Sequence, residues 1–144
     1  MSRLKHRMPA QIRWSDVDQF GHVNNSVYFS LYDLAKTDYL RKVIGADVSK
    51  RLAIVVANIN ANFFLPIFFN EEVDIDTSVV HLGNKSFTLL QRAVDAHTGE
   101  IKCECKTVMV FYDAEANESI LISSDHKEAI CRFEGKTLEE LSAR

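Results

Sequence analysis

A long helix near the N-terminus is the clearest element that the hydrophobic pattern predicts. In residues 24–44, apolar side chains recur at steps of three and four, the spacing of one face of an amphipathic helix. Asn24 has the side chain of a helix N-cap, and Gly45 suits a C-terminal stop. At 1.5 Å per residue, this helix should be about 30 Å long. We therefore expect it to lie across the rest of the fold.

Most of the chain after this helix follows the two-residue period of β-strands. In residues 52–65 one row is apolar and the opposite row carries asparagines. The apolar row consists of Val55, Ala57, Ile59, Ala61, Phe63 and Leu65. Similar alternation recurs in residues 72–82, 86–96 and 101–112, with turn sequences between them. A further short strand is expected at residues 9–15, before the helix.

Two capping-box patterns predict short helices at the end of the chain, one from Asp125 with Glu128 and one from Thr137 with Glu140. The order of strand, long helix and antiparallel strands indicates an α+β fold in which one helix covers one face of one sheet. The 144 residues contain no repeat and no linker, so we expect a single domain, residues 1–144. A sheet covered on one face has another face and an edge to bury, which favours self-association.

Composition excludes several classes of function. The formal net charge is -3 with acids and bases interspersed, so neither nucleic acid nor an anionic membrane is an expected partner. No stretch approaches the roughly 20 apolar residues of a membrane span, and no signal peptide is recognisable, which favours the cytoplasm and no membrane partner. The three cysteines and five histidines lack ligand spacing, so we expect no metal site and no disulfide framework. Cys103 and Cys105 should point into the core.

The stretch DVDQFGHVNN, residues 16–25, has the composition of a functional site rather than of a core. It combines carboxylates, a glycine, an imidazole and two amides in a segment that leads directly into the long helix. The first N–H groups of a helix have no partner within the helix, so they can bind an oxyanion. A reaction that develops negative charge on oxygen is therefore a natural candidate for this segment.

The string DVDQFGHVNNSVYF resembles the hot-dog-fold thioesterases of the 4-hydroxybenzoyl-CoA thioesterase-like group, many of which read DxDxxGHVNNxxYF here. The resemblance extends over about residues 11–112. It implies a hot-dog fold, with one long central helix packed against an antiparallel sheet of about five strands. It also implies a homodimer or homotetramer with active sites at subunit interfaces. The implied activity is hydrolysis of an acyl-CoA thioester to a free acid and a thiol, with no cofactor other than the coenzyme A of the substrate.

The same resemblance assigns roles within the loop. Asp18 is the implied catalytic carboxylate, either as the nucleophile or as the base that activates water. The backbone N–H of Asn25 is the implied oxyanion donor. Gly21 permits a tight turn and leaves room for the acyl group. His22 is a candidate catalytic or positioning group, although related acyl-ACP thioesterases that use this histidine carry asparagine where Phe20 stands here.

Four further residues complete the expected site. Asn24 is both a helix cap and a candidate substrate contact, and Tyr28 is a candidate for the acyl pocket, although an aromatic residue on an apolar stripe also suits the core. Lys85, in the family-like sequence Lys85-Ser86-Phe87, is a candidate contact for the coenzyme A phosphates. Asp16 is expected to be structural.

Three alternatives remain open from the sequence. The carrier could be an acyl carrier protein instead of coenzyme A, the reaction could be that of a hot-dog dehydratase or hydratase, or the chain could bind acyl thioesters without catalysis. In the last case, Asp18 would only anchor a polar loop. Nothing in the sequence indicates the length of the acyl chain.

Overall fold

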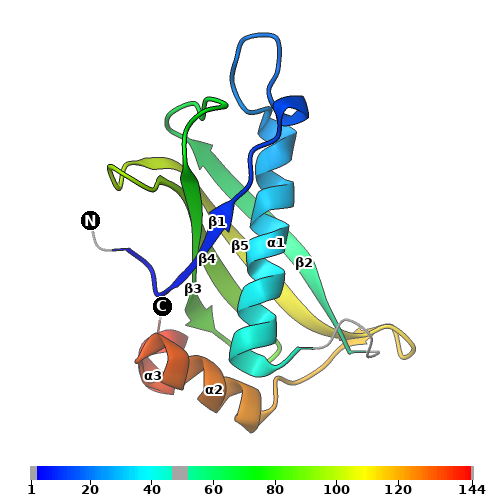
Figure 1. Cartoon of the computed structure of the whole chain (residues 1–144). Coiled ribbons are helices and arrows are strands. Elements are labelled where there is room, and N and C mark those ends of the chain that lie inside the picture. Colours follow the sequence, from blue (N-terminus) through cyan, green and yellow to red (C-terminus); the bar gives the residue numbers. More distant parts are fainter. Residues whose placement is uncertain (1–2, 47–51, 144) are drawn as a thin grey trace.

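The computed structural model describes residues 3–46 and 52–143, and in it one long helix packs against an antiparallel sheet (Figure 1). In chain order, the elements are β1 (His6–Ala10), a 3₁₀ helix (Trp14–Asp16), α1 (Asn25–Ile44), β2 (Leu52–Phe63), β3 (Val73–Leu82), β4 (Ser86–Asp95), β5 (Ile101–Asp113), β6 (Glu118–Ser119), α2 (Ser124–Glu134) and α3 (Leu138–Ser142). The predicted α+β class is confirmed.

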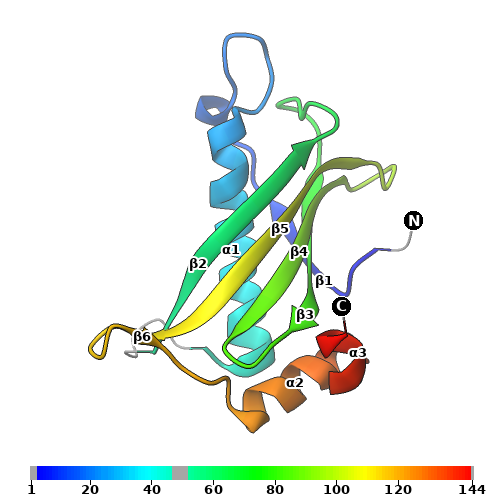
Figure 2. The ribbon, with the colours of Figure 1, turned by 180° about the vertical axis from the view of Figure 1, so that it is seen from behind.

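The strand order in the sheet is β1-β3-β4-β5-β2, and the short β6 pairs with β5. Helix α1 lies along one face of the sheet, with its backbone nearest to β3, α2 and β1. Seen from behind, the opposite face of the sheet is open along most of its length, with α2 and α3 at one end (Figure 2). Strand β2 forms one edge of the sheet, and β1 forms the other.

The boundaries of α1 follow the predicted caps. The Asn24 side chain accepts the Ser26 N–H at 3.0 Å, and Gly45 adopts φ 67°, with its N–H donating to Arg41. Both contacts satisfy backbone groups that a helix end leaves without partners. Within the described ranges, no helix is both long enough and apolar enough to cross a membrane.

The first strand differs from its prediction. It spans His6–Ala10 rather than residues 9–15, and Trp14 lies in the 3₁₀ helix. The cause is Asp16, whose carboxylate accepts the backbone N–H of Arg13 at 2.8 Å and closes a turn. A hydrogen bond between a side chain and a backbone group nearby in the chain competes with the backbone hydrogen bonds of strand pairing.

A register shift in β2 overturns the expected apolar row. The strand pairs with β5, with an irregularity between Val56 and Asn58. The buried residues of β5 alternate from Cys103 to Phe111. Their partners on β2 are Ile54, Val56, Ile59, Ala61 and Phe63. Val55 therefore lies on the opposite face with the asparagines, because an extra residue in a strand reverses the alternation of its side chains.

The inner face of β2 is apolar and uncovered. Val56, Ile59 and Phe63 are each more than 40% exposed, although their β5 neighbours are buried. This apolar strip lies beside the edge of β2 that has no strand partner in the described chain. Exposed apolar surface next to an open strand edge is typical of an association surface.

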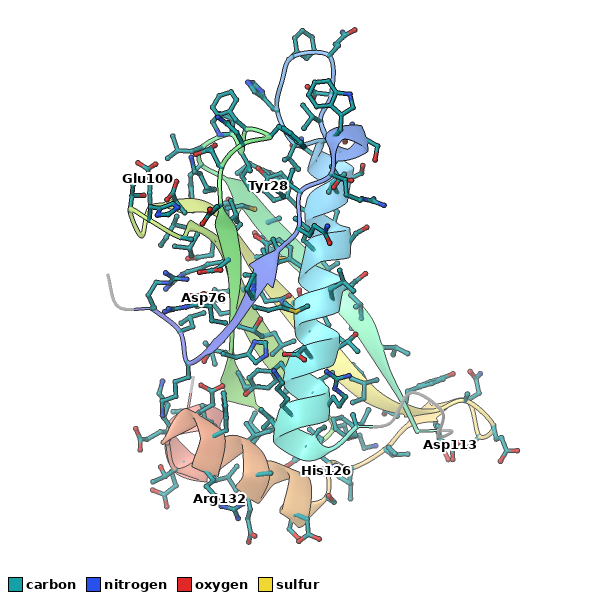
Figure 3. The ribbon with its side chains drawn as sticks, in the orientation of Figure 1. Tyr28, Asp76, Glu100, Asp113, His126 and Arg132 are labelled. Carbon is teal, nitrogen blue, oxygen red and sulfur yellow. The ribbon has the colours of Figure 1, made fainter. Side chains whose placement is uncertain are left out.

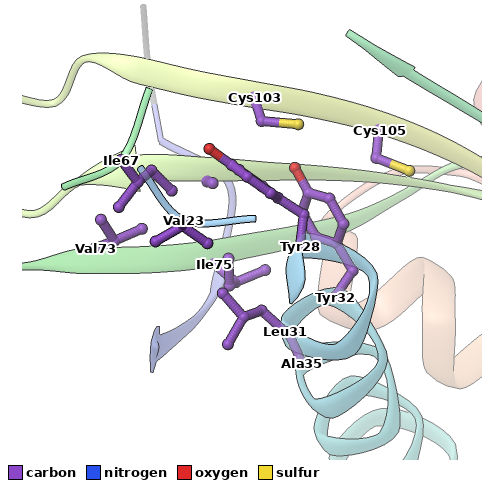
Figure 4. Close-up of a cluster of buried hydrophobic side chains, with 11 residues drawn as sticks. Val23, Tyr28, Leu31, Tyr32, Ala35, Ile67, Val73, Ile75, Cys103 and Cys105 are labelled. Carbon is purple, nitrogen blue, oxygen red and sulfur yellow. The ribbon is translucent and has the colours of Figure 1, made fainter. Parts of the chain in front are cut away.

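Two clusters of buried side chains fill the space between α1 and the sheet. The first lies towards the N-terminal end of α1 (Figure 4) and includes Tyr28, Tyr32, Ile67, Cys103 and Cys105. The second lies towards the other end of α1 and includes side chains of α2 and α3. The core positions predicted for the two β5 cysteines are confirmed, and burial raises the pKa of Cys103 to about 11.

The two C-terminal helices are present, with one changed boundary. Helix α3 has the predicted capping box, in which Thr137 and Glu140 each accept the other's backbone N–H. Helix α2 begins earlier than predicted, because Ser123 rather than Asp125 is its N-cap and accepts the His126 N–H at 3.2 Å.

A buried carboxylate at the end of α2 joins the C-terminal helices to the sheet. Glu134 accepts hydrogen bonds from the Tyr39 hydroxyl, from the Ser78 hydroxyl at 2.7 Å and from the Val79 N–H at 3.0 Å. The pairing of β1 with β3 stops at Thr77, so Glu134 supplies the acceptor that Val79 lacks beyond that point. Burial and the adjacent carboxylate raise the pKa of Tyr39 well above its usual range.

Glu134→Ala is expected to lower the free energy of unfolding by about 3 kcal/mol or more, because three buried donors lose their acceptor together. Urea unfolding followed by circular dichroism measures the change. Glu128→Ala, at an exposed position of the same helix, is the matched control and should stay within about 0.5 kcal/mol of the unaltered protein. Equal destabilisation by the two substitutions would contradict the anchoring role.

Candidate active site

Residues 17–24 form a closed loop between the 3₁₀ helix and α1. The Asp18 N–H donates to the His22 carbonyl at 2.8 Å, and the Gly21 N–H donates to the Asp18 carbonyl at 3.0 Å. Gly21 has φ 84°, a conformation that side-chain-bearing residues rarely adopt. The loop therefore has a defined tight turn at Gly21.

The Asp18 carboxylate is partly exposed and held by backbone N–H groups. Its Oδ1 accepts the N–H of Phe20 at 2.9 Å and, at a longer 3.4 Å, that of His22. Across the described ranges, no hydrogen bond or ion pair engages its Oδ2. One carboxylate oxygen thus orients the group, and the other is available to a substrate or a water molecule.

Asp16 has a different environment, although it lies only two residues away. It is buried, and its carboxylate receives both the guanidinium of Arg13, at 3.0 Å, and the Arg13 backbone N–H, at 2.8 Å. The hydrogen bonds from Arg13 lower the pKa of Asp16 despite burial. This paired, enclosed carboxylate stabilises the entrance to the loop.

The first turn of α1 leaves one backbone donor uncommitted. Asn24 accepts the Ser26 N–H with its side chain and the Val27 N–H with its carbonyl. The N–H of Asn25, the first residue of α1, has no acceptor in the part of the chain that the structure describes. It lies at the positive end of the helix dipole, where an anionic oxygen is stabilised.

The loop is attached to the segment between β2 and β3. The Val23 N–H donates to the Ile67 carbonyl at 2.8 Å, and His22 forms a β-bridge with Phe68. The imidazole of His22 also contacts the ring of Phe68 edge to face, with centroids 5.1 Å apart. The His22 imidazole therefore packs against an aromatic ring. Nothing in the sequence predicted this contact with Phe68.

Tyr28 lies in the core near the N-terminal end of α1 (Figure 3). Burial raises its pKa to about 12, and its ring packs edge to face against Phe63 of β2 at 5.1 Å. Of these two rings, only that of Phe63 has substantial exposure. Phe63 is thus the surface residue next to Tyr28, whereas the sequence pattern placed it in the sheet core.

Lys85 does not lie near Asp18 of the same chain. It is exposed in the turn between β3 and β4, which lies towards the C-terminal end of α1, whereas residues 18–25 lie at its N-terminal end (Figures 1 and 2). The 20 residues of α1 span about 30 Å. A single chain therefore does not bring the two groups to one site.

Comparison with known proteins identifies the family of this fold. The model of the thioesterase-like superfamily matches residues 12–130. The chain belongs to this superfamily. The match includes the loop, α1 and all the main strands of the sheet after β1.

Named relatives within the superfamily are similar at low identity. Acyl-CoA thioester hydrolase YbgC of Escherichia coli O157:H7 is 26% identical over 99 residues, covering 67% of this chain and 74% of its own. Long-chain acyl-CoA thioesterase FadM of Escherichia coli K12 is 23% identical over 122 residues, covering 83% of this chain and 92% of its own. The chain is thus similar to acyl-CoA thioesterases over most of its length.

A solved structure supports the same fold. A thioesterase from Thermus thermophilus, determined with coenzyme A and zinc, superposes with a TM-score of 0.83 at 25% identity. The superposition covers 96% of this chain and 100% of that one, which confirms the predicted hot-dog fold. In the described part of the present chain, no three His, Cys, Asp or Glu side chains gather as a metal site.

In this superfamily member, the predicted site residues of the loop lie together. Two other predicted substrate contacts, Tyr28 and Lys85, do not lie in this loop. Asp18, Gly21 and His22 share the loop that leads to Asn24 and Asn25. Tyr28 is enclosed in the core, and Lys85 lies towards the far end of the helix.

Proposed function

We propose that this protein is an acyl-CoA thioesterase that hydrolyses an acyl thioester to a free acid and coenzyme A. The observation that carries the proposal is that residues 18–25 contain both a carboxylate with one free oxygen, that of Asp18, and an uncommitted backbone N–H, that of Asn25. Thioester hydrolysis needs a nucleophile or base and a donor for the oxyanion that develops on the carbonyl. The similarity to YbgC and FadM supports coenzyme A as the carrier.

In the proposed reaction, Asp18 acts on the thioester carbonyl in one of two ways. It attacks the carbonyl carbon to form an acyl anhydride that water then hydrolyses, or it removes a proton from the water that attacks. In both routes, the Asn25 N–H stabilises the tetrahedral oxyanion, and the C–S bond breaks to release the thiolate of coenzyme A, which takes up a proton. The reaction requires no further cofactor.

The remaining loop residues have supporting roles in this proposal. Gly21 keeps the loop narrow where the acyl group approaches, and Asn24 maintains the start of α1. His22, packed on Phe68, positions the substrate at the side of the loop. Tyr28 contributes to the acyl pocket indirectly, by supporting the more exposed ring of Phe63.

We also propose that the working protein is a homodimer or homotetramer. A second copy placed against β2 would cover the apolar strip of Val56, Ile59 and Phe63 and pair the open strand edge. Since Lys85 is remote from Asp18 of its own chain, it would bind coenzyme A phosphates at the site of another copy.

Lys85→Ala is expected to raise the KM for acyl-CoA by about threefold to tenfold with little change in kcat, because an exposed lysine contributes modest binding to a phosphate. Steady-state kinetics on acyl-CoA measures this effect. The acyl N-acetylcysteamine thioester, which has no phosphate, is the matched control substrate and should show an unchanged KM. An equal change for both substrates would contradict a phosphate contact.

The proposal is tested with a panel of acyl-CoA and acyl-ACP thioesters of different chain lengths, with detection of the released thiol. Thiol release from acyl-CoA is the expected result. Release only from acyl-ACP would reassign the carrier, and conversion of enoyl or hydroxyacyl thioesters without thiol release would indicate a dehydratase or hydratase. Saturable binding without turnover would indicate a non-catalytic acyl-thioester-binding protein.

A further inference from the structure

Five aromatic side chains project from the end of the molecule that carries the Asp18 loop, and we call them the aromatic tip. They are Trp14, Phe20, Phe64, Phe68 and Phe69. Trp14 is 76% exposed and Phe20 is 73% exposed, and the other three rings are between 42% and 56% exposed. Large aromatic side chains at such exposure are costly in water, so a cluster of them indicates a surface that binds a partner.

The aromatic tip is one surface built from two loops. Trp14 contacts Phe69 edge to face with ring centroids 5.2 Å apart, and Phe68 forms the backbone bridge and ring contact with His22. The loop that carries Phe20 stands beyond the N-terminal end of α1 (Figure 1). A Cβ placed on the adjacent Gly21 would meet no atom within 4 Å, so this part of the tip projects into open space.

Two ion pairs lie next to the tip, whereas the Asp18 carboxylate, two residues before Phe20, accepts only backbone N–H groups in the described chain. Arg13 pairs with Asp16 at 3.0 Å, and Lys102 pairs with Glu71 at 2.9 Å. Residues 52–70, which include three of the five rings, contain no charged side chain. Burying the five rings in an apolar medium, with the Asp18 carboxylate left at the aqueous boundary, would therefore desolvate few uncompensated charges.

We propose that the aromatic tip docks on the interface of a lipid bilayer, with its rings inserted among the headgroups and upper acyl chains. Trp concentrates at this depth of a membrane, where its ring meets a polar boundary, and Phe inserts at the same depth from surfaces that lie in the interface. Docking would place the Asp18 loop at the surface into which long-chain acyl thioesters partition. Recognition comes from the apolar rings, so zwitterionic lipid is sufficient.

Docking on a bilayer departs from the expectation that the protein has no membrane partner. That expectation was based on the absence of a spanning segment and of a basic face. Neither criterion detects shallow insertion of uncharged rings, because such binding needs no span and no attraction to anionic lipid. The exposure of the rings and their assembly into one surface became visible only in the fold.

A bilayer suits the tip better than a second copy of the chain does. The apolar strip of β2 lies on an open strand edge, which a second copy can extend by backbone pairing. Phe20 instead belongs to a loop that projects beyond α1. A projecting loop with uncharged aromatic residues enters a fluid interface readily, whereas a protein partner would need a matching cavity.

Trp14 is the only tryptophan of the chain, so its fluorescence reports directly on the tip. Addition of phosphatidylcholine vesicles should shift its emission to the blue, and lipids brominated on their acyl chains should quench it. The protein should float with the vesicles in a density gradient, and the bound fraction should not fall when the salt concentration is raised from about 0.1 M to 0.5 M.

Phe20→Ser should lower the vesicle partition coefficient about tenfold, because one inserted ring is lost. Leu121→Ser is the matched control. Leu121 is 68% exposed and precedes α2 at the other end of the molecule, so its replacement should leave the partition coefficient unchanged.

No blue shift at any lipid concentration, or equal losses of the partition coefficient in the two variants, would overturn the proposal. A lower oligomeric mass of Phe20→Ser in light scattering would overturn it in favour of a second copy. The measurement uses no thioester, so its failure is independent of the proposed hydrolysis.

Discussion

Asp18→Asn is expected to lower the kcat for acyl-CoA hydrolysis by roughly 10²–10⁴-fold. The amide retains an oxygen that can accept the N–H groups of Phe20 and His22, so the loop should keep its shape. What it loses is the negative charge and the basicity that either proposed role of Asp18 requires. The effect should therefore appear in kcat. The circular dichroism spectrum and the thermal unfolding temperature should be the same as those of the unaltered protein.

Asp125→Asn is the matched control for the loss of one negative charge. This residue is exposed in the first turn of α2, at the end of the molecule away from the loop, and its replacement should leave kcat unchanged. Activity of Asp18→Asn equal to that of the control would exclude Asp18 from the reaction. Mass spectrometry of protein quenched during the first turnover separates the two routes, because only direct attack produces an acyl adduct on Asp18.

Asn25→Pro is expected to lower kcat by about 10²–10³-fold, because it deletes the backbone N–H proposed to stabilise the oxyanion. Proline is tolerated at the first position of a helix, where the N–H has no partner within the helix. Asn24, the preceding residue, has φ -63° and ψ 139°, a conformation that residues before proline prefer. The substitution therefore removes a donor without breaking α1.

Asn25→Ala is the control, because it removes the asparagine side chain and keeps the N–H. It should retain most of the activity of the unaltered protein, and both variants should keep the helical signal in far-ultraviolet circular dichroism. If the two variants lose the same activity, then the side chain or the local packing is responsible and the N–H is not the donor. The comparison thus separates a backbone role from a side-chain role at one position.

Elements determined by local interactions were predicted well. Helix α1 has caps within its own sequence, and its ends at Asn24 and Gly45 agree with the prediction. Helix α3 likewise follows from the capping box of Thr137 and Glu140. Prediction failed where a competing contact intervened, as at Asp16, whose bond to Arg13 replaced the second half of the expected first strand with a turn.

The bulge in β2 shows a second kind of limit. Residues 52–57 are all apolar, so the sequence contains no local signal that marks the extra residue beside Val56. The shift exists only in the pairing with β5, and it moves Val55 to the opposite face of the sheet. A register is a property of two strands, and a single strand cannot specify it.

By itself, the sequence determined the long helix and the consecutive residues of the Asp18 loop, because the interactions that form them connect positions close together in the chain, and it indicated the hot-dog class through its resemblance to a known family. Only the tertiary structure decided that Phe68 lies against His22, that Lys85 lies towards the opposite end of α1 from the loop and that β2 has an exposed apolar face. These features depend on contacts or distances between distant segments, and the hydrophobic pattern records which side chains are apolar but not which neighbours cover them.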